Sequence, residues 1–485
     1  MKVFFAAVEA VPFAKVGGLA DVAGTLPLAL TEIGVEASLV MPLHRQCLDH
    51  GPFGLKIQSL PVTLGPRTYE ASVYEGRLEG PGVSVPVYFV RYDPFYDRNG
   101  VYDERNDAAQ RYAFFAKAVV TLADAVGGVD VLHANDYHTA LLAVYARLRE
   151  NPIPTIYTIH NLAYQGVFPM AVGPELGLET EEAIAAVAHN GAINFMAAGI
   201  RNATIVTTVS EKYAQEIQTP EFGEGLQDLL AARAAEGALF GVLNGIDPDM
   251  WNPATDDAIP AKYSSQDLAP KTVCKLQLQR ELGLEVDACR PLAGCIARLA
   301  SQKGLDILAE AVPDMVAMGF QLALLGTGEA ELEQRFRHLA EAYPGRVAAA
   351  IRFDADLARR IYAGSDMFLI PSRYEPCGLT QMISMAYGTI PIARWTGGLA
   401  DTIVEWAEGK IDAEPAPDQN GFLFGKPDKH ELLGALGRAL AAYHDRDRWK
   451  SLILNAMSRD FSWKRSAQRY RQLYEQAVKL QGGQR

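Results

Sequence analysis

The sequence predicts an α/β protein made of two Rossmann-like domains that face a cleft. Its 485 residues are more than a single hydrophobic core accommodates, so at least two domains are expected. Short apolar runs alternate with helical patterns along the chain, which indicates βαβ units. Most of these runs are continuous rather than alternating, as in parallel strands that helices cover on both faces.

The apolar runs give the position of each expected strand. In the first half the strands are expected at residues 3–8, 37–41, 85–90, 129–134, 155–159 and 204–209. In the second half they are expected at residues 292–297, 321–325, 347–351, 367–370 and 390–393. The Gly- and Pro-rich stretch 51–82 is interpreted as a hairpin insertion in the first half.

Breaks in these patterns predict the domain boundaries. The first domain is expected at 1–241 and the second at 255–460, because Asn-Gly and two prolines interrupt every periodicity in a hinge at 242–254. A helix at 461–485 is expected to pack back on the first domain. Its apolar stripe comprises Trp463, Tyr470, Leu473, Tyr474 and Val478.

Composition excludes several classes of protein. A net charge of -13 argues against a general nucleic-acid binder or a protein of anionic membranes, and no apolar run reaches transmembrane length. The five cysteines are odd in number and lack CxxC spacing, which indicates a reducing, cytoplasmic setting without disulfides or structural zinc. No HExxH, GxGxxG or Walker motif occurs, so we expect no metal and no cofactor.

A glycine pair follows the first expected strand and opens a helix. Gly17 and Gly18 allow backbone N–H groups to approach a phosphate or sugar oxygen closely, Lys15 adds a positive charge, and Asp21 can bind a sugar hydroxyl. The alternative is an ordinary turn between a strand and a helix.

Charged residues follow two strands of the second domain. Arg298 and Lys303 follow the strand 292–297, and their positive charges on one loop can bind a diphosphate. The alternative is a pair of solvent-exposed charges on a surface loop. Glu375 lies just past the strand 367–370, where ligands bind in open α/β sheets, and can meet the sugar of a nucleotide-sugar.

Polar residues also end two strands of the first domain. Asp136 follows the strand 129–134, and His160 and Asn161 follow the strand 155–159. These side chains can hydrogen-bond sugar hydroxyls. The alternative for His160 is a structural histidine whose hydrogen bonds are made within its own loop.

Taken together, these motifs resemble the bacterial glycogen synthase and plant starch synthase family of retaining glucosyltransferases. The resemblance rests on segments that span nearly the whole chain, namely KVGGLADV (15–22), HANDYHTALL (133–142), TIHNLAYQGVF (158–168), NGIDPDMWNP (244–253), RLASQKGLDIL (298–308), SRYEPCGLTQM (372–382) and YGTIPIARWTGGLADTI (387–403). Departures from the family pattern are Val16, Asn135, Tyr137 and Trp395, the last at a position where a basic residue is common.

The resemblance implies a GT-B architecture and transfer of glucose from ADP-glucose to glycogen or another α-1,4-glucan. It implies catalytic roles for Glu375, Arg298, Lys303, His160 and Asp136. The substrate-binding residues that it implies are Lys15, Gly17, Gly18, Asp21, Asn161, Asn244, Phe353, Cys377, Gly378, Leu379 and Thr380, with Phe353 expected against the base.

Other functions stay open at this point. Another GT-B enzyme, of the sucrose- or trehalose-phosphate synthase type, would use a different acceptor. A non-catalytic glucan-binding scaffold would bind glucan without turnover. An NAD-dependent oxidoreductase is disfavoured because its glycine fingerprint is absent from the sequence.

Overall fold

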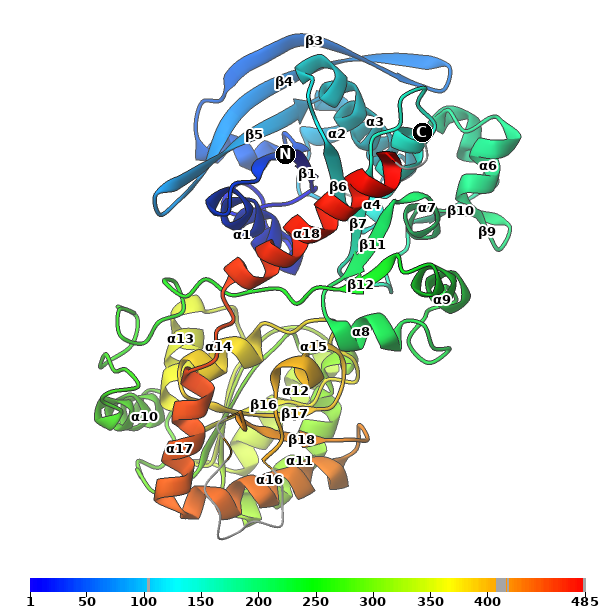
Figure 1. The fold of residues 1–485 in the computed structure, drawn as a ribbon. Coiled ribbons are helices and arrows are strands. Elements are labelled where there is room, and N and C mark those ends of the chain that lie inside the picture. The colour runs from blue at the N-terminus through cyan, green and yellow to red at the C-terminus, as the bar shows by residue number, and fades with distance from the viewer. Residues whose placement is uncertain (103–104, 407–415, 417, 483–485) are drawn as a thin grey trace. The chain divides into compact units, whose positions relative to one another are not determined.

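Two compact units make up the chain, and the helix at its C-terminal end belongs with the N-terminal part. The computed structural model describes residues 1–102, 105–406, 416 and 418–482. Unit 1 comprises Met1–Asn244 and Trp463–Arg485, and unit 2 comprises Gly245–Ser462. The chain therefore passes from one unit to the other twice (Figure 1).

Unit 1 is built on a nine-stranded sheet with the order β12-β11-β7-β6-β1-β2-β5-β4-β3. Its strands are β1 (Lys2–Ala6), β2 (Glu36–Pro42), β3 (Gly54–Leu64), β4 (Arg67–Gly80), β5 (Val83–Arg91), β6 (Val131–Asn135), β7 (Thr155–Ile159), β11 (Ile205–Thr208) and β12 (Leu239–Gly241). The pairs formed by β1, β2, β5, β6, β7, β11 and β12 are parallel, and the hairpin β3–β4 adds to β5 antiparallel. The predicted hairpin insertion is thus confirmed.

A second, three-stranded sheet in unit 1 was not predicted. It consists of β8 (Val167–Phe168), β9 (Ala188–His189) and β10 (Ala192–Asn194) in the order β8-β10-β9. Such short strands give no detectable periodicity in the sequence.

Helices accompany the sheet of unit 1 (Figure 1). The α-helices are α1 (Gly18–Glu32), α2 (Asp93–Tyr96), α3 (Ala108–Val126), α4 (Asp136–Thr139), α5 (Leu141–Arg147), α6 (Glu181–Val187), α7 (Phe195–Asn202), α8 (Glu211–Glu216), α9 (Gln227–Ala235) and α18 (Trp463–Gly482). Two 3-10 helices, η1 (Arg45–His50) and η2 (Met170–Leu176), complete the described elements of this unit.

Helix α18 is fixed to unit 1 by buried polar contacts as well as by apolar packing. The hydroxyl of Tyr474 lies 2.8 Å from Nδ1 of His133 in β6, and Nε2 of His133 lies 2.7 Å from Oγ1 of Thr158 in β7. Burial lowers the pKa of His133 to about 3, so this imidazole is neutral. Of the predicted stripe, Val478 is 39% exposed and does not belong to the core.

Unit 2 contains a six-stranded, entirely parallel sheet with the order β15-β14-β13-β16-β17-β18. Its strands are β13 (Leu292–Ile296), β14 (Gln321–Leu325), β15 (Val347–Ala350), β16 (Met367–Ile370), β17 (Ile390–Arg394) and β18 (Phe422–Phe424). The helices are α10 (Ala269–Glu281), η3 (Ser301–Lys303), α11 (Leu305–Ala317), α12 (Ala330–Ala342), α13 (Ala355–Gly364), α14 (Thr380–Ala386), α15 (Gly397–Thr402), α16 (Lys429–His444) and α17 (Arg446–Met457).

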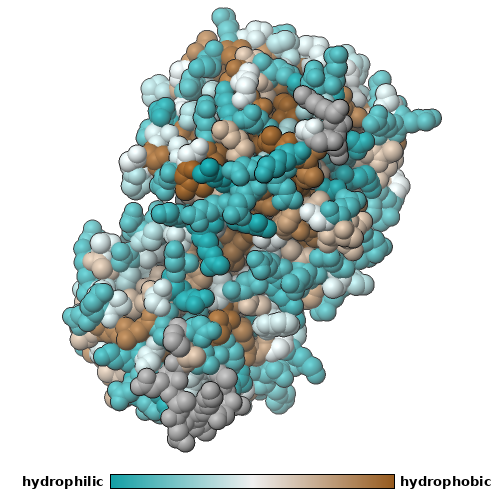
Figure 2. Space-filling view, viewed as in Figure 1, coloured by the Kyte–Doolittle hydropathy of each residue, from teal (hydrophilic) through white to brown (hydrophobic). Residues whose placement is uncertain are grey.

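The predicted fold class is confirmed, since the sheet of unit 1 is mainly parallel, that of unit 2 is entirely parallel, and helices alternate with the strands of both. Within the described residues, no helix is both long and apolar enough to cross a membrane. The face shown in Figure 2 carries mainly hydrophilic residues with smaller apolar patches between them.

Candidate active site

The glycine loop of unit 1 lies between β1 and α1. Gly17 is the N-cap of α1 and has extended backbone angles, and Gly18 is the first helical residue. Nζ of Lys15 lies 2.7 Å from Oδ1 of Asp21, and both side chains are exposed. Two predicted site residues therefore pair with each other, and an exposed pair of this kind contributes little stability and is easily opened by a ligand.

The carboxylate of Glu9 fills the space behind this loop, which the sequence analysis missed. Its Oε2 accepts hydrogen bonds from the backbone N–H groups of Val16 (2.6 Å) and Gly17 (2.9 Å). Its Oε1 accepts from the hydroxyl of Tyr102 (2.9 Å), and the residue is only 2% exposed. The Gly17 N–H, expected to meet a phosphate, thus already binds an internal anion.

Asp136 lies directly after β6 in a left-handed conformation with φ 55°. Its Oδ1 accepts hydrogen bonds from the backbone N–H groups of His160 (2.8 Å) and Asn161 (3.4 Å). Burial raises the pKa of Asp136 to about 7, against which these two hydrogen bonds act. The structure therefore joins the segments that follow β6 and β7, and perturbed carboxyl groups of this kind cluster at functional sites.

His160 is held in one orientation by Asn135. Its Nε2 lies 2.9 Å from Oδ1 of Asn135, whose own amide donates to the carbonyl of Ala6 (3.1 Å). Burial lowers the pKa of His160 to about 4, while the nearby Glu9 carboxylate raises it. A neutral imidazole that donates from Nε2 keeps Nδ1 as a hydrogen-bond acceptor. Since β1, β6 and β7 are neighbouring parallel strands, the glycine loop after β1 and His160 after β7 lie at the same edge of the sheet.

In unit 2, Glu375 forms an ion pair with Lys303. Nζ of Lys303 lies 2.9 Å from Oε1 and 2.6 Å from Oε2, and the hydroxyl of Ser372 donates to Oε2 (2.9 Å). The side chains of Lys303 and Glu375 are 25% and 10% exposed. The carboxylate is thus held firmly just past the end of β16, as expected from the sequence.

Arg298 lies next to this pair, around a cavity of about 200 Å³. The cavity is lined by residues that follow β13 and β16, among them Arg298, Lys303, Ser372, Glu375 and Thr380. Among the described contacts, the exposed guanidinium of Arg298 makes one 3.5 Å hydrogen bond to Gln302. A weakly bound cation beside an empty volume can accept an anionic ligand without breaking a strong bond.

Glycines allow the loops around this cavity to pack closely. A Cβ on Gly304, which has φ +65°, would lie 1.9 Å from the carbonyl oxygen of Pro371. A Cβ on Gly397 would lie 1.9 Å from the carbonyl oxygen of Glu375. The N–H of Gly398 donates to the carbonyls of Glu375 and Pro376 (3.1 and 3.2 Å), so it binds the Glu375 loop rather than a phosphate.

The remaining predicted residues occupy varied environments. Asn244 is 6% exposed, and its Oδ1 has no hydrogen-bond partner among the described residues. Phe353, expected against a base, is 91% exposed between β15 and α13. The four remaining predicted residues lie in the turn that follows Glu375. Cys377 is buried, Gly378 has φ +69°, Leu379 is the N-cap of α14, and Thr380 is its first residue.

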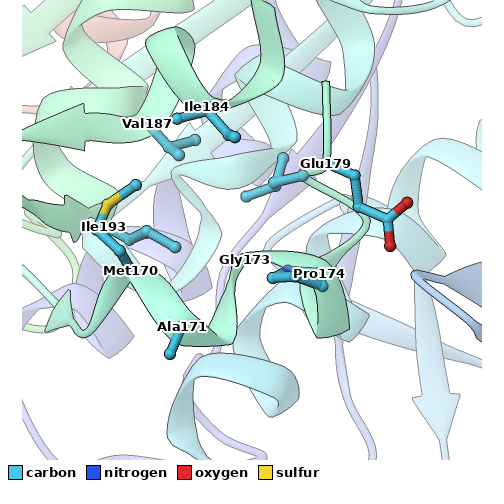
Figure 3. Close-up of a pocket in the computed structure, with 9 residues that line it drawn as sticks. Met170, Ala171, Gly173, Pro174, Glu179, Ile184, Val187 and Ile193 are labelled. Atoms are coloured by element: carbon cyan, nitrogen blue, oxygen red, sulfur yellow. The ribbon is translucent and has the colours of Figure 1, made fainter. Parts of the chain in front are cut away.

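A hollow in unit 1 differs in character from the cavity of unit 2. It measures about 440 Å³ and lies among η2, α6 and β10. Figure 3 shows apolar side chains such as Met170, Ile184 and Ile193 around it, while the carboxylate of Glu179 points away from them. It contains none of the predicted site residues. Among the described residues, no group of three His, Cys, Asp or Glu side chains is arranged to hold a metal ion.

Two family descriptions match this chain. Residues 2–232 match the starch synthase catalytic domain, and residues 290–442 match the glycosyl transferases group 1. The first match contains the Glu9, Asp136 and His160 site of unit 1, and the second contains the Lys303 and Glu375 site of unit 2.

Two relatives that are similar over the full length of the chain carry the name glycogen synthase. The chain is 42% identical to the glycogen synthase of Syntrophotalea carbinolica and 43% identical to that of Thermotoga maritima, with 99% of each chain covered in both cases. The solved catalytic domain of starch synthase IV from Arabidopsis thaliana, bound to ADP and acarbose, is 34% identical with a TM-score of 0.86 and 99% of each chain covered. A sucrose-phosphate synthase from Thermosynechococcus elongatus is 19% identical with a TM-score of 0.59 over 98% of each chain, which is a likeness of fold alone. On the full-length similarity and the two domain matches, this chain belongs to the glycogen synthase and starch synthase family.

Proposed function

We propose that this chain is a glycogen (starch) synthase that transfers glucose from ADP-glucose to the non-reducing end of an α-1,4-glucan, with retention of configuration. The observation that carries the proposal is the Lys303–Glu375–Ser372 cluster beside Arg298, around a cavity at the carboxyl ends of β13 and β16. Full-length similarity to glycogen synthases, and to a starch synthase solved with ADP and acarbose, supports the choice of donor and acceptor.

In this proposal, unit 2 holds the donor. Arg298 binds the diphosphate directly, because its guanidinium is exposed and weakly engaged. Lys303 touches both the diphosphate and Glu375, so its charge stabilises the leaving group while it orients the carboxylate. Phe353 packs against the base. The Cys377–Thr380 turn lies beside the glucose.

Unit 1 holds the sugar hydroxyls. Nδ1 of the neutral His160 accepts a hydrogen bond from a glucose hydroxyl, and Asp136 and Asn161 fix neighbouring hydroxyls. Lys15 and the Gly17–Gly18 loop approach the donor phosphate, the loop through Gly18, while the N–H of Gly17 stays bound to Glu9. When Lys15 turns to the phosphate, Asp21 loses its ion-pair partner and accepts from a sugar hydroxyl instead. Asn244 supplies its unpartnered amide oxygen to the substrate.

Retention fits departure and attack on the same face of the glucose. The bond between the anomeric carbon and the diphosphate oxygen breaks, an acceptor hydroxyl forms the new bond, and its proton passes to the departing phosphate. Glu375 then stabilises positive charge at the anomeric carbon without forming a covalent intermediate. The reaction requires both units, which we propose close about a hinge at 242–254.

The direct test compares two site variants with matched surface controls. Glu375→Gln and Arg298→Ala are expected to lower kcat by about 10³-fold or more, because each removes charge that stabilises the transition state. Glu331→Gln and Arg337→Ala change the same residue types on the exposed face of α12 and should leave kcat unchanged. Near-wild-type turnover in both site variants would refute the assignment.

A substrate screen separates the rival enzymes. Release of ADP from ADP-glucose, or of UDP from UDP-glucose, is measured with glycogen, fructose or glucose-6-phosphate as acceptor. We expect turnover with ADP-glucose and glycogen, and turnover that survives a chelator. A fructose or sugar-phosphate acceptor would favour the sucrose- or trehalose-phosphate class, and glucan binding without ADP release would favour a scaffold. The proposed cytoplasmic setting is tested separately by cell fractionation.

A further inference from the structure

A second hollow in unit 2, with both apolar and charged lining residues, lies away from the donor cavity. It measures about 510 Å³ and is formed by Trp395 after β17, the edge strand β18 with the following Gly425, and side chains that include Glu431 and Arg438 of α16. Among the described residues, its lining and that of the donor cavity have no member in common.

Trp395 is the aromatic group of this hollow. Its residue surface is 52% exposed, although tryptophan is usually among the most buried side chains of a protein. Leu423 and Phe424 of β18 also line the hollow, and the backbone N–H of Trp395 donates to the carbonyl of Phe424 (2.8 Å). This bond ties the backbone that carries the indole to the edge strand.

The polar groups of the hollow are held in fixed positions. Oε1 of Glu405 accepts from Nε of Arg438 (3.3 Å), and its Oε2 accepts from the backbone N–H of Leu423. Arg438 also donates to the carbonyl of Leu423 (2.6 Å), and Oε2 of Glu431 accepts from the N–H of Gly425 (3.3 Å). A carboxylate has about four acceptor positions, so Glu431, whose carboxylate accepts the one described bond from Gly425, can accept from a further hydroxyl while it stays in place.

We propose that this hollow, centred on Trp395 with Glu405, Glu431 and Arg438, is an accessory site for an α-glucan chain. A pyranose ring has a face of C–H groups that packs on an indole, whose own face is electron-rich. Its hydroxyls donate to carboxylates and accept from a guanidinium. The proposal rests on the proposed function, which supplies the class of sugar.

Charge disfavours the main competing ligand. Among the described lining residues are two carboxylates, Glu405 and Glu431, and the guanidinium of Arg438, which already forms an ion pair with Glu405 (3.2 Å). The guanidinium of Arg394 is also engaged, because its Nε donates to the carbonyl of Gly425 (3.0 Å). A nucleoside diphosphate that stacked its base on Trp395 would place its phosphates among these carboxylates, which costs free energy. A neutral oligosaccharide meets no such repulsion.

The position of the hollow suits a long acceptor. The Glu375 loop follows β16, Trp395 follows β17, and the hollow adjoins β18, so all lie along the same carboxyl edge of the parallel sheet. Neighbouring strands are about 4.8 Å apart, which places β18 roughly 10 Å from β16. A glucan held at this site stays close to the donor cavity without occupying it.

The test uses the full chain and a binding measurement that needs no turnover. Trp395→Ala, Trp395→Phe and the control Val273→Ala, at a residue 51% exposed on α10, are compared by native electrophoresis in gels with and without glycogen. Loss of one stacking contact worth about 1–1.4 kcal/mol weakens binding roughly five- to tenfold. We expect Trp395→Ala to lose retardation and Trp395→Phe to keep most of it, with the control unchanged.

Kinetics with two acceptors gives an independent reading. For Trp395→Ala the KM for glycogen should rise about five- to tenfold, while the KM for ADP-glucose and turnover with maltotriose stay within about twofold of wild type. Unchanged retardation and an unchanged KM for glycogen would overturn the proposal. An equal rise in the KM for ADP-glucose would also overturn it, by assigning Trp395 to the donor. If no ADP is released with any glucan, the proposed function fails, and the gels still decide whether the accessory site exists.

Discussion

Removal of the Lys303 ammonium should destabilise unit 2 through Glu375. Lys303→Met keeps the length of the side chain but leaves a carboxylate, whose side chain is 10% exposed, with the Ser372 hydroxyl as its remaining described hydrogen-bond donor. Loss of one partner from a buried ion pair costs about 3–5 kcal/mol, and the 25% exposure of Lys303 favours the lower end. For a unit the size of Gly245–Ser462, about 3 kcal/mol corresponds to a fall in Tm of roughly 6–12 °C.

A double-mutant cycle identifies the source of this loss. Glu375→Gln alone should cost about 1 kcal/mol, because Lys303 can turn towards solvent. The double variant Lys303→Met with Glu375→Gln removes the unpaired charge and should recover about 2 kcal/mol relative to Lys303→Met. Calorimetry of all four proteins measures the coupling. If the two single losses simply add, within about 0.5 kcal/mol, the ion pair does not stabilise the unit as described.

Three further changes test the site and fold of unit 1. Asp136→Asn keeps the Oδ1 acceptor but cannot ionise. Burial raises the pKa of Asp136 from 3.8 to about 7, so the free energy of unfolding of the wild type falls as pH rises through this interval. Near pH 7 the variant should therefore be more stable than the wild type by up to roughly 4 kcal/mol, as measured by urea unfolding between pH 4 and 8. A difference that does not grow with pH would contradict this. Tyr474→Phe leaves Nδ1 of His133 without the hydroxyl and should cost about 1–2 kcal/mol, whereas no loss would mean that a water replaces it. Glu9→Ala should raise the KM for ADP-glucose about tenfold, because the glycine loop loses its internal acceptor, while Glu9→Gln, whose amide oxygen still accepts from the loop, should raise it less; equal effects would assign the role to charge.

Much of the fold was predictable because buried parallel strands leave a strong trace in the sequence. The runs 155–159, 321–325 and 367–370 coincide with β7, β14 and β16 to the residue. Continuous apolar residues in those runs have no other favourable position than a sheet covered on both faces. The short strands β8, β12 and β18 were not predicted, because two or three residues are too few to show a hydrophobic periodicity or an apolar run of strand length.

The site was predictable as a set of positions but not as a set of contacts. Lys303 and Glu375 were expected near the donor from their places after two strands, yet they are 72 residues apart and their direct ion pair required the structure. Glu9 was missed although a signal existed. It lies between two apolar runs, Ala6–Val8 and Ala10–Phe13, where a carboxylate must find buried donors.

Helix α18 makes the order of synthesis matter for unit 1. Tyr474, which contacts His133 of β6, leaves the ribosome only after all of unit 2 has been translated. At about 5–20 residues per second, unit 1 therefore waits on the order of ten to forty seconds with the surface beneath α18 uncovered. During that interval the apolar side chains that α18 later covers stay exposed on the nascent chain, and docking of α18 buries them.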